Sequence, residues 1–342
     1  MRCIAIDVMG GDKAPQAIMD GVASALAGDL GDFKLLLVGL EDVVKSELQR
    51  IGRSNDPRVE IVPATQVVGM DEPAVAAIRS KKDSSLNVAA ELVKEGRAQA
   101  FFSAGNTGAL VSSAVLRLRN LPGIQKPAIA VTMPTTTGEF ILLDAGAVVD
   151  CKPEHLVQFA IMGDVYARLL HGKPNPKVGL LNVGSEEMKG NELAREVHGL
   201  LKAVPGINFI GNIEANEMFA GKADVVVCDG FVGNIVLKTS EGLPRAIFGL
   251  LKEELTRNPL RTLGAFLAKP AFMAIRKRMN PDEYGGAAIL GVNGVCVKGH
   301  GSSKARAVEC AINVVRRTVD LGVNQRIVER IQQLNLAASS QE

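Results

Sequence analysis

The amino-acid sequence predicts an α/β fold in which a mostly parallel sheet is doubly wound, with helices on both faces. Short apolar, β-branched runs alternate with segments of helical period along most of the 342 residues. The runs are continuously apolar, which is typical of strands that are covered on both faces. Several runs are followed by short loops rich in Gly, Asn and Ser, where a strand gives way to a helix.

The order of these segments supports parallel strands joined by crossover helices. Strands are expected at 3–8, 34–38, 59–62, 100–102, 128–132, 141–143, 178–182, 208–210 and 225–228. Helices are expected at 15–27, 41–51, 85–96, 153–171 and 191–203. Residues 132–139 join two strand candidates with a turn-forming Pro, Thr and Gly sequence and predict a hairpin.

Composition excludes several classes of function. A formal net charge of +2, no Trp and two Tyr give no reason to expect nucleic-acid binding. The five cysteines form no C-x-x-C pair, so neither a metal site nor a disulfide framework is expected, and a reducing cytosol fits best. Neither nucleotide-binding glycine motif is present, and no cofactor is expected. The sequence contains no uninterrupted stretch of about 18 apolar residues, the length that a membrane-spanning helix needs. We therefore expect a soluble protein that is at most peripheral to a membrane.

The region 235–282 departs from the α/β pattern. Apolar residues recur at helical spacing around Leu243 and Leu251, and Pro259 and Pro270 bracket a second apolar segment. Between Leu255 and Pro281 every charged residue is basic. Two interpretations remain open and can coexist: a helix pair buried in a homodimer interface, or a helical tip in contact with lipid. The residues expected to contact a membrane or an acidic protein partner are Arg257, Arg261, Phe266, Phe272, Arg276 and Arg278.

These patterns divide the chain into three parts. Residues 1–234 and 283–335 are expected to form an α/β catalytic unit with a cleft, and 235–282 a protruding helical element. Residues 336–342 are expected to be a disordered tail. Pro244 is expected to kink or restart the helix that follows Asn234, because proline removes a helical hydrogen bond.

Five loops rich in Gly, Asn and Ser at strand ends, residues 7–12, 103–109, 182–190, 229–234 and 300–303, point to an anion as ligand. A helix N-terminus carries about half a positive charge, and glycine lets the backbone approach a ligand closely. In a doubly wound sheet such loops gather outside the carboxyl ends of the strands. The candidate binding residues are Asp7, Gly10, Gly11, Asp12, Gly105, Asn106, Thr107, Asn182, Gly184, Glu187, Asp229, Gly233, His300, Ser302 and Ser303.

Each loop also has a purely structural interpretation. Asp12, Asn234 and Ser303 are residues that commonly cap helices. Lys189 lies near a helix start, where its charge opposes the helix dipole; a bound anion would compensate, although a solvated lysine explains it equally well. His300 is either a proton donor or a hydrogen-bonding support. None of the serines stands in G-x-S-x-G, so no covalent nucleophile is indicated.

The order of the five loops and their residue sequences resemble those of the bacterial phosphate acyltransferase family, which makes acyl phosphate from acyl-acyl carrier protein for phospholipid synthesis. The resemblance runs from Ile4 to about Val319 and includes Lys238, Glu241 and Gly242 after the 229–234 loop. It implies a fold similar to isocitrate and isopropylmalate dehydrogenases and phosphotransacetylases, and a homodimer. It also implies a cytoplasmic protein loosely associated with the inner face of the cell membrane, with acyl carrier protein, inorganic phosphate and a membrane-bound glycerol-3-phosphate acyltransferase as partners.

The reaction implied by the resemblance needs little more than binding and orientation, because phosphate can itself attack a thioester. Lys189 is then expected to neutralise the attacking phosphate. Asn234, with backbone N–H groups near Gly233 and Gly10, is expected to hold phosphate or the developing oxyanion. The alternatives are a phosphotransacetylase acting on short acyl-coenzyme A and a non-catalytic membrane scaffold for lipid-synthesis proteins.

Overall fold

The structure is a computed structural model that describes residues 2–339, and it is built on one twisted sheet of eleven strands. The strand order is β3-β2-β1-β4-β11-β10-β5-β6-β9-β7-β8. The antiparallel pairings are those of β5 with β6, β5 with β10 and β10 with β11, and the other pairings within the described sheet are parallel. The strands are β1 (Arg2–Asp7), β2 (Phe33–Gly39), β3 (Val59–Pro63), β4 (Ala100–Ser103), β5 (Ala128–Pro134), β6 (Glu139–Leu143), β7 (Lys177–Leu181), β8 (Asn208–Ile213), β9 (Val225–Val227), β10 (Ala287–Leu290) and β11 (Val295–Lys298).

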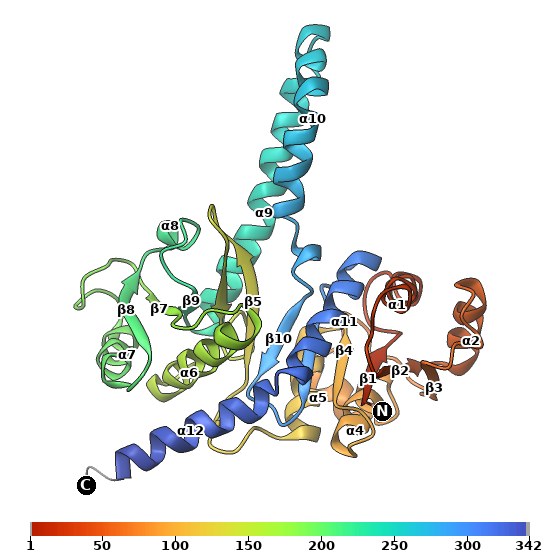
Figure 1. Cartoon of the computed structure of the whole chain (residues 1–342), viewed down its shortest axis with the longest axis horizontal. Coiled ribbons are helices and arrows are strands. Elements are labelled where there is room, and N and C mark those ends of the chain that lie inside the picture. Colours follow the sequence, from red (N-terminus) through yellow and green to blue (C-terminus); the bar gives the residue numbers. More distant parts are fainter. Residues whose placement is uncertain (1, 340–342) are drawn as a thin grey trace.

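Helices cover both faces of this sheet, so the prediction of a doubly wound α/β fold is confirmed (Figure 1). One face packs against α1 (Gln16–Ala27), α2 (Glu41–Arg50), α6 (Pro153–Leu170), α7 (Glu192–Ala203), α11 (Ala305–Asp320) and α12 (Val323–Ser339). The other face packs against α3 (Ala74–Ser80), α4 (Ser85–Lys94), α5 (Thr107–Leu118) and α8 (Ala215–Met218). Apolar side chains are buried on both faces of the strands, which explains why the strand sequences are continuously apolar.

The predicted hairpin at 132–139 is present, with Pro134 opposite Glu139 in the β5–β6 register. Two strands were not predicted. β10 and β11 pair with each other and are inserted between β4 and β5 at the centre of the sheet. Each has four residues and is flanked by glycines, so its apolar run is too short to be recognised.

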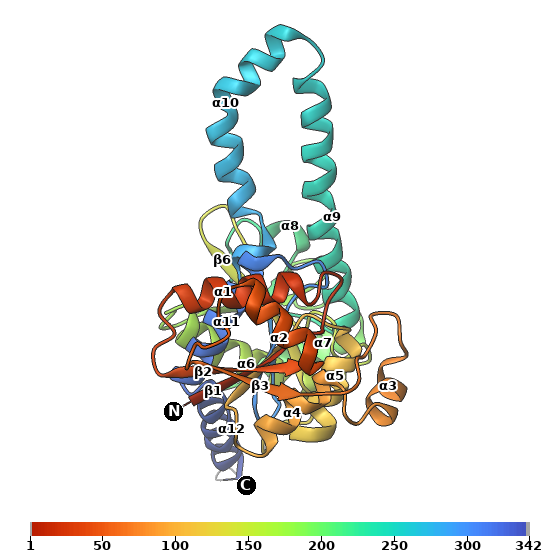
Figure 2. The same ribbon diagram turned by 90° about the vertical axis from the view of Figure 1, so that its right-hand side faces the viewer.

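Helices α9 (Gly230–Leu255) and α10 (Pro259–Arg278) project from the sheet as a long pair, open between their middle parts in the turned view (Figure 2). Pro244 does not restart the helix, because α9 is continuous from Gly230 to Leu255, and α10 likewise passes through Pro270. On a projecting helix the carbonyl that a proline leaves without a helical partner can bond to water. No helix in residues 2–339 combines the length and apolar character needed to cross a membrane.

The C-terminal helix extends further than expected. α12 runs to Ser339, so residues 336–339 of the expected disordered tail are helical; residues 340–342 lie outside the described residues. Leu336, Ala337 and Ala338 have high helix propensity, which favours helix in this segment.

Candidate functional site

The carboxyl ends of β1 and β4 meet where the winding of the sheet reverses, because β1 leads to β2 on one side and pairs with β4 on the other. There the Ser103 hydroxyl donates a hydrogen bond of 2.6 Å to Asp7 Oδ2, and the Gly105 N–H donates to Ser103 Oγ at 3.1 Å. Both side chains are buried. Burial raises the pKa of Asp7, and the hydrogen bond from Ser103 opposes this shift. This pair forms a fixed polar floor under the loops.

The glycines of the first loop are required by close packing. A Cβ at Gly10 would lie 2.6 Å from Asp7 Oδ2 and 2.7 Å from Ser103 Oγ, and Gly11 has φ +115°. The Asp12 N–H donates to the Gly301 carbonyl at 2.8 Å, which joins this loop to the 300–303 loop. Asp12 is not a helix cap, because α1 begins after Pro15. Two loops far apart in the sequence are thus brought together, as predicted.

Asn106 has a structural role in the 103–109 loop. It is the N-cap of α5, since its Oδ1 accepts a hydrogen bond of 3.0 Å from the Ala109 N–H. Its Nδ2 donates to the carbonyls of Met70 at 2.7 Å and Glu72 at 3.2 Å. Its amide is therefore occupied by the protein itself, and of this loop it is Thr107 that lines a cavity.

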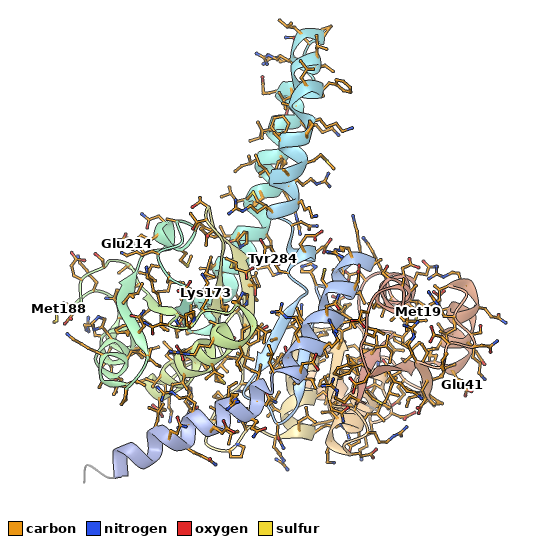
Figure 3. All side chains as sticks on the ribbon, viewed as in Figure 1. Met19, Glu41, Lys173, Met188, Glu214 and Tyr284 are labelled. Atoms are coloured by element: carbon orange, nitrogen blue, oxygen red, sulfur yellow. The ribbon has the colours of Figure 1, made fainter. Side chains whose placement is uncertain are left out.

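The 182–190 loop is ordered around Asn182, whose Nδ2 donates to the Lys189 carbonyl at 3.0 Å. Glu187 forms an exposed ion pair of 2.8 Å with Lys202. The Lys189 side chain is exposed, and Figure 3 shows its neighbour Met188 at the outer edge of the molecule, away from Tyr284. Tyr284 lines the inner cavity described next, so this arrangement does not bring Lys189 to it. The catalytic role of Lys189 stays a prediction.

The inner cavity, of about 120 Å³, lies between the base of α9, the carboxyl end of β11, the amino end of β10 and the neighbouring part of β5. Among the residues that line it are Thr107, Asn234, Lys238, Glu241, Lys298, His300 and Ser303. The sequence prediction included Thr107, Asn234, His300 and Ser303. It left Lys238 and Glu241 without a role, although both belong to the motif after the 229–234 loop, and it did not consider Lys298, which directly precedes the His300 loop.

Asn234 lines the inner cavity and does not cap a helix. The N-cap of α9 is Asp229, whose Oδ1 accepts a hydrogen bond of 2.9 Å from the Val232 N–H. A Cβ at Gly233 would lie 1.8 Å from the Asp144 carbonyl oxygen, so the first turn of α9 rests directly on the loop after β6. Within residues 2–339 the Asn234 amide has no hydrogen-bond partner, so it can bind a ligand.

A chain of charges runs along one side of the inner cavity. Lys238 Nζ lies 2.9 Å from Glu241 Oε2, and His300 Nε2 lies 3.7 Å from the same oxygen. The Ser302 N–H donates to His300 Nδ1 at 3.1 Å, so Nδ1 is an acceptor and the ring proton on Nε2 faces Glu241. Burial would raise the pKa of Glu241, but His300 and Lys238 together lower it to about 2. Glu241 is therefore a carboxylate under ordinary conditions.

Ser302 and Ser303 have different surroundings. Ser302 Oγ lies 2.8 Å from His300 Nδ1 and helps to orient the ring. Ser303 is buried. It is not the N-cap of α11, because that helix begins at Ala305 and its N-cap is Lys304. The Ser303 N–H closes a turn by donating to the His300 carbonyl at 2.9 Å, and this turn places Ser303 in the lining of the inner cavity.

An outer groove of about 1000 Å³ continues from the inner cavity between α9 and α10, and the two share Glu241, Asp282 and His300. Its apolar lining includes Phe248, Leu251, Leu255, Phe266, Phe272 and Met273, and its basic lining Lys13, Arg245, Lys252, Lys269, Arg276 and Lys304.

The residues expected to contact a membrane or a carrier protein are in three places. Phe266, Phe272 and Arg276 line the outer groove. Arg257 and Arg261 pair with Glu254 at 3.1 and 2.5 Å, at the end of α9 and the start of α10. Arg278 donates to the carbonyls of Thr135 and Thr136 at 2.8 and 2.7 Å, so it fastens the base of α10 to the β5–β6 hairpin.

Several solved structures resemble this fold. A phosphotransacetylase from Streptococcus pyogenes superposes with a TM-score of 0.64 at 15% identity, covering 93% of this chain and 94% of that one. A phosphotransacetylase from Staphylococcus aureus gives 0.62 at 15% identity, with the same coverage. At this level of identity the likeness concerns the fold alone, and the expected similarity to phosphotransacetylases is confirmed.

Comparison of sequences is more specific. A protein named phosphate acyltransferase from Heliobacterium modesticaldum is 48% identical over 330 residues, covering 96% of each chain. The protein of the same name from Alcanivorax borkumensis is 45% identical over 313 residues, covering 92% of each chain. The family model described as fatty acid synthesis protein matches residues 2–326. The chain therefore belongs to the fatty acid synthesis protein family, in which its relatives are phosphate acyltransferases, as its five loop motifs predict.

Proposed function

We propose that this protein transfers a long-chain fatty acyl group from acyl-acyl carrier protein to inorganic phosphate and so makes acyl phosphate for glycerophospholipid synthesis. The observation that carries the proposal is the junction of two spaces. The inner cavity is lined by two lysines and by Asn234, whose amide has no partner within residues 2–339, and the large outer groove has apolar walls. The first suits a small anion and the second a long apolar group. The name shared by the relatives supports the same reaction.

The proposed chemistry is direct attack. A phosphate oxygen attacks the thioester carbonyl carbon, a C–O bond forms, the C–S bond breaks, and the carrier thiol leaves with the proton that the phosphate loses. The enzyme binds both substrates and holds them in line, and such positioning can lower a barrier by about 7–11 kcal/mol in the best cases.

The Asn234 amide is proposed to donate to phosphate or to the oxyanion that develops on the carbonyl. Its place at the inner cavity and its lack of a partner within the described residues support this role. Lys189 is proposed to neutralise phosphate. Because its side chain is exposed, this role requires that the 182–190 loop bring it to the inner cavity when substrate binds.

The basic lining of the outer groove supports docking of the carrier there, because acyl carrier protein is strongly acidic. Arg276 is proposed to contact the carrier, and Arg257 and Arg261 to contact either the carrier or anionic lipid. Arg276→Glu is expected to raise the Michaelis constant for acyl carrier substrate without loss of liposome binding. Lys94→Glu, at an exposed residue of α4, controls for the change in net charge. Loss of liposome binding with an unchanged Michaelis constant would assign Arg276 to lipid.

A homodimer with peripheral membrane contact is proposed from the apolar surface of α9 and α10. Leu260 is 80% exposed, Leu267 73% and Phe266 70%. An exposed apolar patch of this kind usually marks an interface. The proposed location is the cytoplasm, loosely associated with the inner face of the cell membrane, where a membrane-bound glycerol-3-phosphate acyltransferase would take up the product. Sedimentation with and without liposomes tests both contacts.

The same exposed helices favour one alternative, a scaffold that gathers lipid-synthesis proteins at a membrane. The two functions differ in thioester chemistry. The proposed enzyme releases carrier thiol from acyl carrier substrate only when phosphate is added, whereas a scaffold binds without thioester loss. Thiol release measured with and without phosphate decides between them.

A further inference from the structure

Lys298 is the last residue of β11, and its backbone is fixed at the centre of the sheet. In register it lies beside Ser103 of β4 and Ala287 of β10. A Cβ at Gly299 would lie 2.8 Å from Phe102 Cζ, and a Cβ at Gly286 would lie 2.4 Å from the Lys298 carbonyl oxygen. Tight packing on both sides therefore gives Lys298 a defined position at the strand end, next to the Asp7–Ser103 floor.

The Lys298 side chain faces the inner cavity. Side chains alternate along a strand, so Lys298 shares a face with Cys296 and opposes Val297. Cys296 is buried in the apolar layer with Phe101 and Leu110, and Val297 is buried in the layer on the other face. One step beyond Cys296, this apolar layer ends and the inner cavity begins, and Lys298 lines it together with Asn234.

Lys298 brings an additional positive charge into this space. Glu241, a carboxylate that lines the same cavity, is paired with Lys238 at 2.9 Å. Within residues 2–339 the Lys298 ammonium has no hydrogen bond and no ion pair. Burial lowers the pKa of Lys298 to about 8; Lys238 adds to this decrease, while Glu241 and Asp12 oppose it. Asp282, Tyr284 and His300 are the other titratable groups at the cavity wall.

A half-buried ammonium without a counter-ion is costly, and an anion that enters the cavity removes that cost. We propose that Lys298 binds the phosphate substrate: its ammonium and the Asn234 amide hold the same anion while a phosphate oxygen attacks the thioester. The proposal rests on the proposed function and adds to it a phosphate ligand built into the rigid sheet. The phosphoryl group stays negatively charged when phosphate becomes acyl phosphate, so Lys298 can neutralise it throughout the reaction.

Binding of inorganic phosphate, measured by calorimetry on the full chain without acyl substrate, tests the proposal. Lys298→Met is expected to raise the dissociation constant roughly tenfold or more, the effect of losing one charge-assisted hydrogen bond. Lys82→Met, at an exposed lysine between α3 and α4, is the matched control and is expected to bind as the wild type does. An unchanged dissociation constant in a folded Lys298→Met protein would overturn the proposal.

The pH dependence of binding supplies a readout that a merely structural lysine would not give. In the wild type, affinity for phosphate is expected to fall as pH rises above about 8, because Lys298 then loses its charge. Lys298→Arg keeps a positive charge and is expected to bind phosphate with that fall abolished. Should Lys298→Met fail to fold, these two profiles still decide: affinity that stays flat in the wild type, or falls equally in the Arg variant, contradicts the proposal.

This test separates the role of Lys298 from the proposed function. If the wild type binds phosphate through Lys298 but forms no acyl phosphate, the proposed function fails and the phosphate site stands. If the wild type forms acyl phosphate and Lys298→Met does so with the same Michaelis constant for phosphate, the function stands and the role of Lys298 is wrong.

Discussion

Ser103 donates a hydrogen bond of 2.6 Å to Asp7 across the neighbouring ends of β4 and β1, at the point where the winding of the sheet reverses. The pair is buried directly beneath Gly10, whose backbone has no room for a side chain. The pair therefore joins the loop after β1 to the loop after β4, at a strand end that lies beside Lys298 of β11.

Ser103→Ala tests this contact. Removing the donor is expected to lower the free energy of unfolding by about 1–3 kcal/mol, because a buried acceptor loses its partner. Ser103 favours the charged form of Asp7, whose pKa burial raises, so the loss is expected to be larger at about pH 7 than at about pH 4. Denaturant unfolding at both pH values measures it; an equal loss at both would mean that Asp7 does not ionise in the folded protein.

Glu241→Gln tests the charge chain at the inner cavity wall. Because its neighbours lower the pKa of Glu241 from 4.5 to about 2, the ionised carboxylate contributes stability that is present above 4.5 and lost as pH falls toward 2. The Gln variant is expected to be less stable than the wild type at about pH 6 and to approach it at about pH 3. A constant difference across this range would show that Glu241 is not held as a carboxylate.

Gly233→Ala and Gly242→Ala form a matched pair on α9. A Cβ at Gly233 would lie 1.8 Å from the Asp144 carbonyl, so the helix start must shift at a cost of about 1–3 kcal/mol. Gly242 has nothing within 4 Å of its Cβ position, and alanine there is expected to stabilise the helix by about 0.5–1 kcal/mol. Thermal unfolding of the two variants should therefore move in opposite directions.

Asn234→Ala is expected to lower turnover roughly a hundredfold or more, the effect of losing one oxyanion donor, and to leave the fold intact. Thr239→Ala, at an exposed position further along α9, is the control. Turnover with acyl carrier substrate and phosphate, together with thermal unfolding, checks both variants.

Lys189→Ala is likewise expected to lower turnover roughly a hundredfold, because an attacking phosphate would lose a counter-charge. Lys222→Ala, an exposed lysine paired with Glu217, is the control. Near-normal turnover in both Lys189→Ala and Asn234→Ala would remove the assignment made from the loop motifs. Near-normal turnover in Lys189→Ala alone would leave neutralisation of phosphate to Lys298.

The sequence predicts the parts of this molecule that depend on local patterns. The strand runs, the hairpin at 132–139 and the helix expected at 153–171 all follow from local sequence patterns. β10 and β11 do not, because four-residue runs become strands only through pairing with β4 and β5, which lie more than a hundred residues away.

The role of an individual polar residue depends on its exact position relative to the start of a helix, and a difference of one or more residues changes that role. Asn106 and Asn234 both follow strands in Gly-rich loops, yet Asn106 immediately precedes its helix and caps it, whereas Asn234 comes after the N-cap Asp229 and keeps its amide free within the described residues. Similarly, the position of Lys189 near a helix start suggests an anion ligand, whereas Lys298 ends an apolar strand whose sequence gives no indication of a ligand. Only the arrangement of the sheet brings Lys298 to the same cavity as Asn234.

The most direct test of the proposed function is to trap its product. The protein is incubated with phosphate and either long-chain acyl-acyl carrier protein or acetyl-coenzyme A, and hydroxylamine converts any acyl phosphate to a hydroxamate. We predict a long-chain hydroxamate that requires both phosphate and the carrier substrate. A hydroxamate from acetyl-coenzyme A alone would show a phosphotransacetylase instead, and no phosphate-dependent hydroxamate from either substrate would contradict the proposed function.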